Sequence, residues 1–524
     1  GIGVTANAMD SSSVGYIPAG TGNVPTNVQT KLRESVSTSD FATFQAAADA
    51  AAALGKSLFI PAGVYTQTLV LTATHDNLRI YGEGAGTPSD PILTVLHAPN
   101  TSTAIISATI CNGLILENIA VLNTAGNNGT HYGIYYSGCS DMQILNCRVE
   151  AFNVNIFLDS SSIPKIDNVV SKNAVFASTG TGHGFYMKGT PTTPAIGAWI
   201  RNSYFNSNEK DGLRFEDVES PTITACEALL NAEYGLIHKS TNTGINTSTG
   251  AAISNSFFDT NTVGSVYLQD VFLAMLSNVW TSAASGSGVG LTLNNVRQSS
   301  INVTANACAS HGVLLTGTCY DNAISGIAKG NTGSGVYIDT GSRFNTFAGF
   351  SSTGNTTYGF FSNNTTAASP NDFRGTISTG NGTASYLITS IDIPAKPLNV
   401  TFSYGYANFA ASGAADMTAN ATAGTTEYVV PAKGNIIGIS SALSAVVTAG
   451  TLSFSAKVNG SSDADTTIQN NVTFPQYRYL EIARGLAPVA AGDRIVATYG
   501  GDGSLAPNGT LDGIVTIFLE LQGS

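Results

Sequence analysis

One short phrase recurs through the middle of this chain, and it limits the fold more than any other feature of the sequence. Each copy places an apolar–variable–apolar–variable strand beside a turn position that is usually glycine. The first inward apolar residues of successive copies lie 22, 29, 28, 23, 30, 25, 22, 23 and 24 residues apart. A strand of period two that returns about every 20 to 30 residues predicts a solenoid of β-coils. The copies are YGIYYS (132–137), VNIFLD (154–159), HGFYMK (183–188), DGLRFE (211–216), YGLIHK (234–239), GSVYLQ (264–269), VGLTLN (289–294), HGVLLT (311–316), SGVYID (334–339) and YGFFSN (358–363).

Asparagine recurs four residues before the glycine position of this repeated phrase. In stacked coils such a position lies directly above its own copy in the next coil, so the side chains are predicted to form an asparagine ladder at a turn. We therefore interpret these asparagines as structural rather than catalytic. They are Asn208, Asn231, Asn261, Asn331 and Asn355.

The six cysteines are predicted to be buried apolar thiols, because none has CxxC spacing and so large a chain needs no disulfides. Cys147 and Cys226 lie in a second apolar strand that follows the phrase, which indicates a second face of each coil. Histidine is also sparse and no HExxH pattern occurs. We expect no catalytic metal and no cofactor.

Composition excludes several classes of partner. The chain of 524 residues carries a net charge of −12, so a nucleic-acid partner is not expected. No run approaches about 18 apolar residues, so no membrane-spanning helix is expected. The opening GIGVTANAMD lacks the basic and apolar regions of a signal peptide and is interpreted as the cut end of a longer protein.

The two ends of the chain differ from the repeats. FATFQAAADAAAALG (41–55) predicts an amphipathic helix that ends at Gly55 and caps the open end of the solenoid. After about residue 395 the repeat stops, and alternating strands such as GTLSFSAKV and GIVTIFLEL follow at wider spacing. These strands predict a separate antiparallel β-sandwich.

The segment NVQTKLRESVSTSDF (27–41) resembles the link between the particle-anchoring head and the catalytic body of bacteriophage tailspike proteins. The helix that follows, with LFIPAGVY and NLRIYGEG, resembles the first coil of the pectate-lyase-like right-handed β-helix in those proteins. The resemblance covers about residues 27–86. It implies a homotrimeric, receptor-binding depolymerase of the virion that cleaves a bacterial capsule or O-antigen polysaccharide. It also implies attachment to the phage tail or baseplate through a head that precedes this sequence.

The expected fold is therefore all-β: a right-handed parallel β-helix with an N-terminal capping helix, followed by an antiparallel β-sandwich. We assign residues 1–40 to the linker from the head, 41–394 to the β-helix catalytic domain and 395–524 to the sandwich. The role of the sandwich is left open between trimerisation and carbohydrate binding.

Aligned copies of the phrase place two columns of side chains on the solvent face of one parallel sheet, because alternate residues of a strand point outward. Coils stack about 4.8 Å apart, so neighbours in a column are in near contact. The first column is Tyr135, Phe157, Tyr186, Arg214, Ile237, Tyr267, Thr292, Leu314, Tyr337 and Phe361, and the second is Ser137, Asp159, Lys188, Glu216, Lys239, Gln269, Asn294, Thr316, Asp339 and Asn363.

Hydrolysis of a glycosidic bond needs two carboxyl groups. Asp159 and Glu216 lie two coils apart in one column, roughly 9 to 10 Å, which approaches the separation in inverting enzymes. Lys188 lies between them and would keep one carboxyl ionised. The alternative is that Asp159, Lys188, Glu216 and Lys239 form a stabilising ladder of alternating charge.

The stretch EKDGLRFEDVE (209–219) holds five acids in a chain that is only 11% charged. Glu216 points outward from the strand. Asp211 and Glu209 lie in the preceding turn and are reserve catalytic candidates that would lean over the same groove. Asp217 and Glu219 lie beyond the strand and are interpreted as solvated or turn-forming.

Several outward side chains around these acids are expected to bind substrate. Aromatic rings can stack on sugar rings, and cations bind hydroxyl groups or acidic sugars. Trp199 is expected in a Pro/Gly loop of the insert 188–205, either beside the groove as a sugar platform or packed beneath the loop. His238 points inward by register. The substrate-binding candidates are Phe157, Tyr186, Lys188, Trp199, Arg214, Lys239 and Tyr267.

Three functions are compatible with these residues. The first is a glycoside hydrolase that uses Glu216 and Asp159. The second is a lyase acting on uronic acids, with Lys188, Lys239 or a tyrosine as the base and Arg214 or a cation on the uronate carboxylate. The third is a non-catalytic adhesin in which the same face only binds polysaccharide.

Overall fold

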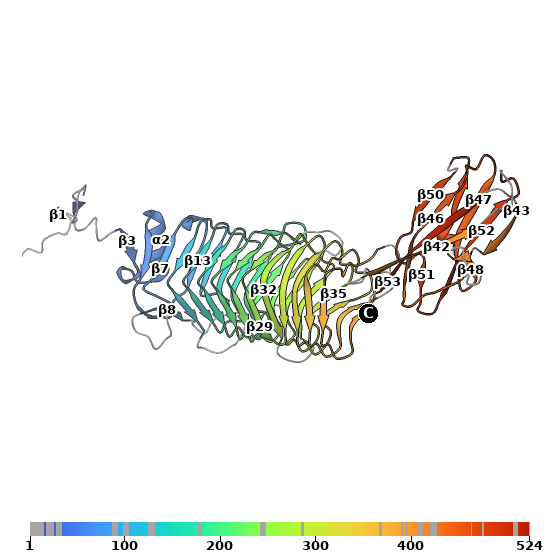
Figure 1. The fold of residues 1–524 in the computed structure, drawn as a ribbon. Helices are drawn as coiled ribbons and strands as arrows, with labels where there is room; N and C mark the ends of the chain where they lie inside the picture. The colour runs from blue at the N-terminus through green and yellow to red at the C-terminus, as the bar shows by residue number, and fades with distance from the viewer. Residues whose placement is uncertain are drawn as a thin grey trace, which may run out of the picture. The chain divides into compact units, whose positions relative to one another are not determined.

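The copies of the repeated phrase form strands that stack in parallel in a computed structural model of the chain (Figure 1). The chain divides into two compact units, residues 1–292 with 307–310, and residues 293–306 with 311–524. The structure describes residues 15–16, 26–27, 34–85, 93–97, 104–123, 132–176, 181–241, 248–283, 288–365, 369–388, 392, 397–406, 412–416, 418–419, 427–462, 464–473, 476–506 and 512–522.

The first unit contains the predicted helix, α2 (Phe44–Ala53). It begins where the Thr43 hydroxyl accepts a hydrogen bond from the backbone N–H of Ala46 at 3.1 Å, and it ends before Gly55, whose φ of +61° suits glycine. Phe44 and three alanines of the helix are buried. The helix is confirmed within the range that the sequence indicates. Before it lie β1 (Gly15–Tyr16), β2 (Thr26–Asn27), β3 (Ser35–Ser37) and η1 (Thr38–Asp40).

One parallel sheet of the first unit, called here the site sheet, takes one strand from each coil. Residues of these strands alternate between buried and more exposed positions, as the period of two predicts. The solenoid of parallel β-coils is thus confirmed. Its strands are β6 (Leu69–Leu71), β9 (Ile106–Thr109), β12 (Tyr132–Ser137), β15 (Val154–Asp159), β18 (His183–Lys188), β22 (Leu213–Glu216), β26 (Tyr234–Lys239) and β30 (Gly264–Gln269).

A second parallel sheet of this unit, the companion sheet, takes mostly two short strands from each coil. Their apolar residues face a continuous core that includes Cys147 and Cys226. The strands are β4 (Ser57–Ile60), β5 (Gly63–Tyr65), β7 (Arg79–Gly82), β8 (Thr94–His97), β10 (Ile115–Glu117), β11 (Ala120–Leu122), β13 (Gln143–Leu145), β14 (Arg148–Glu150), β16 (Lys165–Asp167), β17 (Val170–Lys172), β20 (Trp199–Arg201), β21 (Tyr204–Asn206), β24 (Thr222–Thr224), β25 (Glu227–Leu229), β28 (Ala252–Ser254), β29 (Phe257–Asn261) and β32 (Met275–Ala283).

All six cysteines are buried and free of disulfides, as predicted. Burial raises the pKa of the Cys147 thiol to about 12, so this side chain stays a neutral, apolar group at physiological pH. These thiols fill the core of the coils.

The asparagine ladder is confirmed. In the first unit the Asn208 amide donates to Asn231 Oδ1 at 2.8 Å, and the Asn231 amide donates to Asn261 Oδ1 at 2.8 Å. In the second unit Asn331 donates to Asn355 at 2.8 Å. Buried amides whose donors and acceptors are all used fix the register of neighbouring coils.

One corner residue is strained. Ile110 follows β9 with φ +54° and is 64% exposed, whereas Gly138 occupies a corresponding corner after β12. A β-branched residue is disfavoured in this left-handed region by about 1 to 3 kcal/mol.

We expect Ile110→Asn to raise the free energy of unfolding by about 1 kcal/mol, measured by denaturant titration. The control Val70→Asn, at a similarly exposed β-branched residue of strand β6 with no positive φ, should give no gain; equal effects at both sites would contradict the strain argument.

The second unit begins with further coils of the same kind. Its one-strand-per-coil sheet contains β35 (Val313–Thr316), β37 (Val336–Ile338), β39 (Tyr358–Ser362) and β41 (Ala384–Leu387), and its other parallel sheet contains β34 (Ser300–Asn306), β36 (Ala323–Lys329), β38 (Phe350–Thr353) and β40 (Ile377–Thr379). A second ladder runs from Asn322 through Asn345 to Asn371, whose amide donates to the buried Asp392.

The C-terminal part of the chain forms two antiparallel sheets that share one buried apolar cluster. The first sheet contains β42 (Pro397–Tyr406), β44 (Thr418–Ala419), β46 (Gly434–Leu443), β50 (Tyr477–Glu481), β51 (Pro488–Val489) and β53 (Gly513–Gln522), and the second contains β43 (Ser412–Asp416), β45 (Tyr428–Val429), β47 (Thr451–Val458), β48 (Ser461–Ser462), β49 (Ile468–Asn471) and β52 (Arg494–Asp502). The change from parallel to antiparallel pairing that the sequence predicts is confirmed. The predicted domain boundary at residue 394 lies outside the described residues.

Among the residues described above, none belongs to a helix with both the length and the apolar character needed to span a membrane.

Candidate functional site

The register of the site sheet confirms both outward columns in the first unit. Strand pairing aligns Phe157 with Tyr186 and then Arg214, and it aligns Asp159 with Lys188 and then Glu216. Lys239 follows Glu216 on β26. The side chains that the sequence assigns to one face therefore do lie in register on neighbouring strands.

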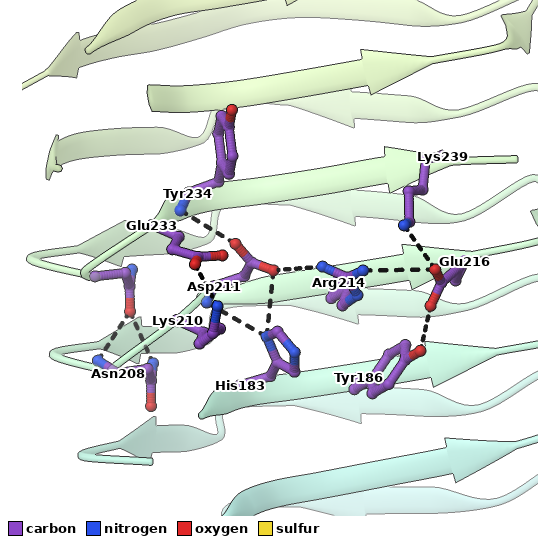
Figure 2. Close-up of polar contacts among 11 residues, drawn as sticks. His183, Tyr186, Asn208, Lys210, Asp211, Arg214, Glu216, Glu233, Tyr234 and Lys239 are labelled. Atoms are coloured by element: carbon purple, nitrogen blue, oxygen red, sulfur yellow. Dashed lines mark hydrogen bonds and ion pairs between the residues drawn. The ribbon is translucent and has the colours of Figure 1, made fainter. Parts of the chain in front are cut away.

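Glu216 belongs to a cluster of polar side chains on this face, where it contacts Tyr186, Arg214 and Lys239 (Figure 2). Its side chain is largely covered. One carboxylate oxygen accepts a short hydrogen bond from the Tyr186 hydroxyl, and the other lies 2.7 Å from Lys239 Nζ. Burial acts to raise the pKa of Glu216, but the hydrogen bonds from Lys239 and Tyr186 and the charges of Arg214 and Lys239 outweigh it and lower the pKa to about 2. Glu216 is therefore an ionised carboxylate and cannot serve as a proton donor near neutral pH.

Asp211 lies deeper, with no exposed surface. Its Oδ2 lies 3.0 Å from Arg214 Nη1 and 3.2 Å from His183 Nδ1, and its Oδ1 accepts the backbone N–H of Tyr234 at 3.1 Å. Burial acts to raise the pKa of Asp211, but His183 and Arg214 hold it below its ordinary value. Asp211 is therefore covered by its partners, and it is joined to Glu216 through Arg214.

Arg214 connects the two acids. Nη1 donates to Asp211 at 3.0 Å, while Nη2 makes a longer contact of 3.5 Å with Glu216 Oε1. Its guanidinium also lies 5.5 Å from the centre of the Tyr186 ring. Two carboxylates thus share one planar cation.

Asp159 and Lys188 stand apart from this cluster. Asp159 accepts a hydrogen bond from the Ser160 hydroxyl at 3.2 Å, and Lys188 is exposed. In the described part of the chain Lys188 forms no ion pair with Asp159 or Glu216. For Glu216 the role of keeping the carboxyl ionised belongs to Lys239 and Arg214 rather than to Lys188, and for Asp159 the expectation stays a prediction. The predicted ladder of alternating charge is formed at the Glu216–Lys239 step alone.

Two other acids of 209–219, Glu209 and Asp217, stabilise turns, whereas Glu219 lies in the short strand β23 (Val218–Glu219). Glu209 is exposed and accepts the backbone N–H of Phe176 at 2.7 Å, so it is not brought to Glu216. Asp217 is buried at a corner with φ +52° and accepts the backbone N–H of Thr241 at 2.8 Å. The turn-forming interpretation of Asp217 is confirmed.

The aromatic rings of the first column pack on one another. Phe157 and Tyr186 are stacked with centroids 5.0 Å apart, and Tyr135 lies 5.5 Å from Phe157. Tyr267 packs against Tyr234 at 5.4 Å, and its hydroxyl donates to Gln269. The ring faces of Phe157 and Tyr186 that point along the column are covered by neighbouring side chains. These two rings therefore offer little free surface for stacking on a sugar.

Trp199 lies away from the site sheet. The insert forms β19 (Ala195–Ile196), which pairs with β23 (Val218–Glu219), and then β20 of the companion sheet, where Trp199 is 59% exposed beside Lys165 and Thr222. The expectation of a loop position was wrong, because the insert resumes strand pairing before Trp199. His238 is buried and points inward as predicted, and burial lowers its pKa to about 4.

One column was missed from the sequence. His183, Asp211 and Tyr234 each occupy the position before the glycine of the phrase, and they meet on adjacent strands. This shared position before the glycine is the sequence signal that places His183 next to Asp211.

Within the described ranges, no group of three or more His, Cys, Asp or Glu side chains is arranged to hold a metal ion.

Comparisons with known proteins agree with the fold. The family model described as periplasmic copper-binding protein (NosD) matches residues 97–284. A search of curated proteins finds no match. The solved structure of tailspike protein 3 of bacteriophage CBA120 is similar with a TM-score of 0.54 at 14% sequence identity, covering 72% of this chain and 64% of that one.

Two further solved structures are similar. The Dettilon tailspike protein has a TM-score of 0.47 and 11% identity, covering 94% of this chain and 95% of that one. The A-module of the mannuronan C-5 epimerase AlgE6 of Azotobacter vinelandii has a TM-score of 0.42 and 16% identity, covering 69% and 100%. The chain spans less than two thirds of the CBA120 tailspike. The resemblance to tailspike proteins is confirmed at the level of the fold.

Proposed function

We propose that this chain is a phage tailspike that binds a bacterial surface polysaccharide, capsule or O-antigen, and hydrolyses its glycosidic bonds. The observation that carries the proposal is the ionised carboxylate of Glu216 on the outward face of the site sheet, held by Tyr186, Lys239 and Arg214. A second carboxyl, Asp159, stands two strands away in the same column. Two carboxyl groups on one face are what hydrolysis of a glycoside requires.

The two carboxyls take different roles. Glu216 cannot donate a proton, so it acts as the base that removes a proton from the attacking water. Asp159 enters the step as the protonated acid and gives its proton to the leaving oxygen, and the water oxygen forms the new bond to the anomeric carbon as the glycosidic bond breaks. Two strand spacings correspond to roughly 9 to 10 Å, which suits inversion.

Binding groups surround this pair. Lys188 is an exposed cation on β18, between the strands of Asp159 and Glu216, and contacts substrate hydroxyl or acidic groups. Arg214 and Lys239 contribute through their positive charges, which keep the Glu216 carboxylate ionised. The sequence also offers one more acid and four aromatic side chains as catalytic or substrate-binding candidates: Glu209, Phe157, Tyr186, Trp199 and Tyr267. Among these, Tyr186 donates a hydrogen bond to Glu216 and does not stack on a sugar ring.

The proposal also includes the handedness of the coils, the cap on the first coil, the domain boundaries and the partners. The coils are right-handed, α2 caps the first coil, and the C-terminal sheets form a sandwich for trimerisation or carbohydrate binding. The domains are 1–40, 41–394 and 395–524. The partners are two further copies of the chain, the polysaccharide and the phage tail or baseplate, and the site of action is the bacterial surface.

Product analysis in heavy-oxygen water tests the reaction. The chain is incubated with purified capsule and O-antigen polysaccharides, and the released oligosaccharides are analysed by mass spectrometry. Hydrolysis places one heavy oxygen at the new reducing end of each product. Unsaturated products without the label would instead identify a lyase, and binding without release from any polysaccharide of the host would identify an adhesin.

A further inference from the structure

We propose that Asp211 is a positioning residue that holds the Arg214 guanidinium back from Glu216, so that Glu216 stays available as a base. This inference deepens the proposed hydrolysis and rests on it for its kinetic consequences. It replaces the expectation that Asp211 itself is a catalyst, since a carboxylate without exposed surface does not touch substrate.

The contacts of Arg214 are unequal. Nη1 lies 3.0 Å from Asp211, within ordinary hydrogen-bond range, whereas the 3.5 Å contact of Nη2 with Glu216 is long. An arginine beside a free carboxylate tends toward a pair of parallel short hydrogen bonds. Asp211 prevents that arrangement by engaging the other side of the same planar group.

Asp211 is itself held firmly. His183 Nδ1 lies 3.2 Å from Oδ2, and the backbone N–H of Tyr234 donates to Oδ1. His183 is buried and packs edge-on against the Tyr186 ring at 5.3 Å. The holding carboxylate is therefore anchored from both neighbouring strands, β18 and β26.

Removing Asp211 has a defined consequence. Arg214 then turns fully onto Glu216, which makes the carboxylate a weaker base and slows proton removal from water. The charged and titratable groups around the two acids, all of which remain in an Asp211→Asn variant, are Tyr186, His183 and Lys188 on β18, Lys210 in the turn, Arg214 on β22, and Tyr234 and Lys239 on β26.

The kinetic test is a double-mutant cycle. Asp211→Asn is expected to lower kcat about tenfold with little change in KM, and to move the acidic limb of the pH–rate profile to lower pH. Adding Arg214→Gln should restore part of kcat and move that limb upward, because the cation that suppresses the base is gone. A kcat loss that the second substitution leaves unchanged or deepens would overturn the proposal.

Asp217→Asn is the matched control, because Asp217 is also a buried acid of the same coil but contacts Ser240 and Thr241. It should lower stability without moving the pH limb. An equal limb shift in this control would show a general folding effect and overturn the proposal.

Crystal structures of the wild-type and Asp211→Asn chains test the same point without activity. Arg214 should move onto Glu216 with two short hydrogen bonds in the variant, and an unmoved guanidinium would overturn the inference. If wild-type chain cleaves nothing, or Glu216→Gln stays active, the proposed function fails, while this structural comparison still decides the role of Asp211.

Discussion

A Glu216→Gln variant is expected to cleave the polysaccharide about 10²- to 10⁴-fold more slowly than the wild-type chain, because it loses the base that activates water. Glutamine keeps the shape of the side chain and an oxygen that accepts from Tyr186, so the strand register should be preserved. The initial rate of reducing-end release at saturating polysaccharide is the measurement.

The control for this variant is Glu233→Gln, which removes an acid of the following turn that pairs with Lys210 and does not touch Glu216. Its rate should stay within about twofold of wild type. Asp159→Asn should lose activity as Glu216→Gln does. A Glu216→Gln chain that keeps most of its rate would remove Glu216 from the reaction.

Replacing Asn231 by alanine is expected to lower the free energy of unfolding by about 3 to 5 kcal/mol. Its buried amide donates to Phe205 O at 2.9 Å and to Asn261 at 2.8 Å, and its oxygen accepts from the backbone and the side chain of Asn208. In the alanine variant, these buried donors and acceptors lose the hydrogen bonds that Asn231 makes. Denaturant-induced unfolding measures the loss.

An exposed asparagine provides the control for the ladder. Asn302 in β34 donates to the Ser325 hydroxyl at 3.0 Å on the surface, where water can replace the bond. Asn302→Ala should change the free energy of unfolding by no more than about 0.5 kcal/mol. A loss at Asn231 as small as that at Asn302 would show that the ladder adds no stability.

The stacked architecture could be predicted because it depends on patterns that survive in the sequence. Alternation within the phrase fixes which residues face the core, and the recurrence of the phrase fixes which residues become neighbours. For this reason the columns through Tyr186 and Glu216, the ladder through Asn231 and the inward position of His238 were all predicted correctly.

The pairing of charges could not be predicted from the same patterns. Register places Glu216 between Lys188 and Lys239, but only the direction of the long side chains decides which of them reaches it. Arg214 lies in the other column and still contacts Glu216, because its long side chain reaches two residues along the same strand. Aromatic register likewise did not reveal that Phe157 and Tyr186 use their faces on each other.

Trp199 shows that the secondary structure of an insert is also hard to predict from sequence. The proline and glycine residues of the insert indicate a loop, yet β19 finds a partner in β23 and the chain rejoins the companion sheet before the tryptophan. That pairing depends on a segment more than twenty residues later. Local composition therefore gave the wrong element.

The parallel stacking of the first unit has a consequence for its dynamics. Each coil is held by the coil before it and the coil after it, so opening should proceed as fraying from exposed ends rather than from the interior. Strands β15, β18, β22 and β26 have paired neighbours on both sides. Backbone amides around Glu216 should accordingly be among the slowest of this unit to exchange with deuterium, so the geometry of the candidate site persists while outlying coils open and close.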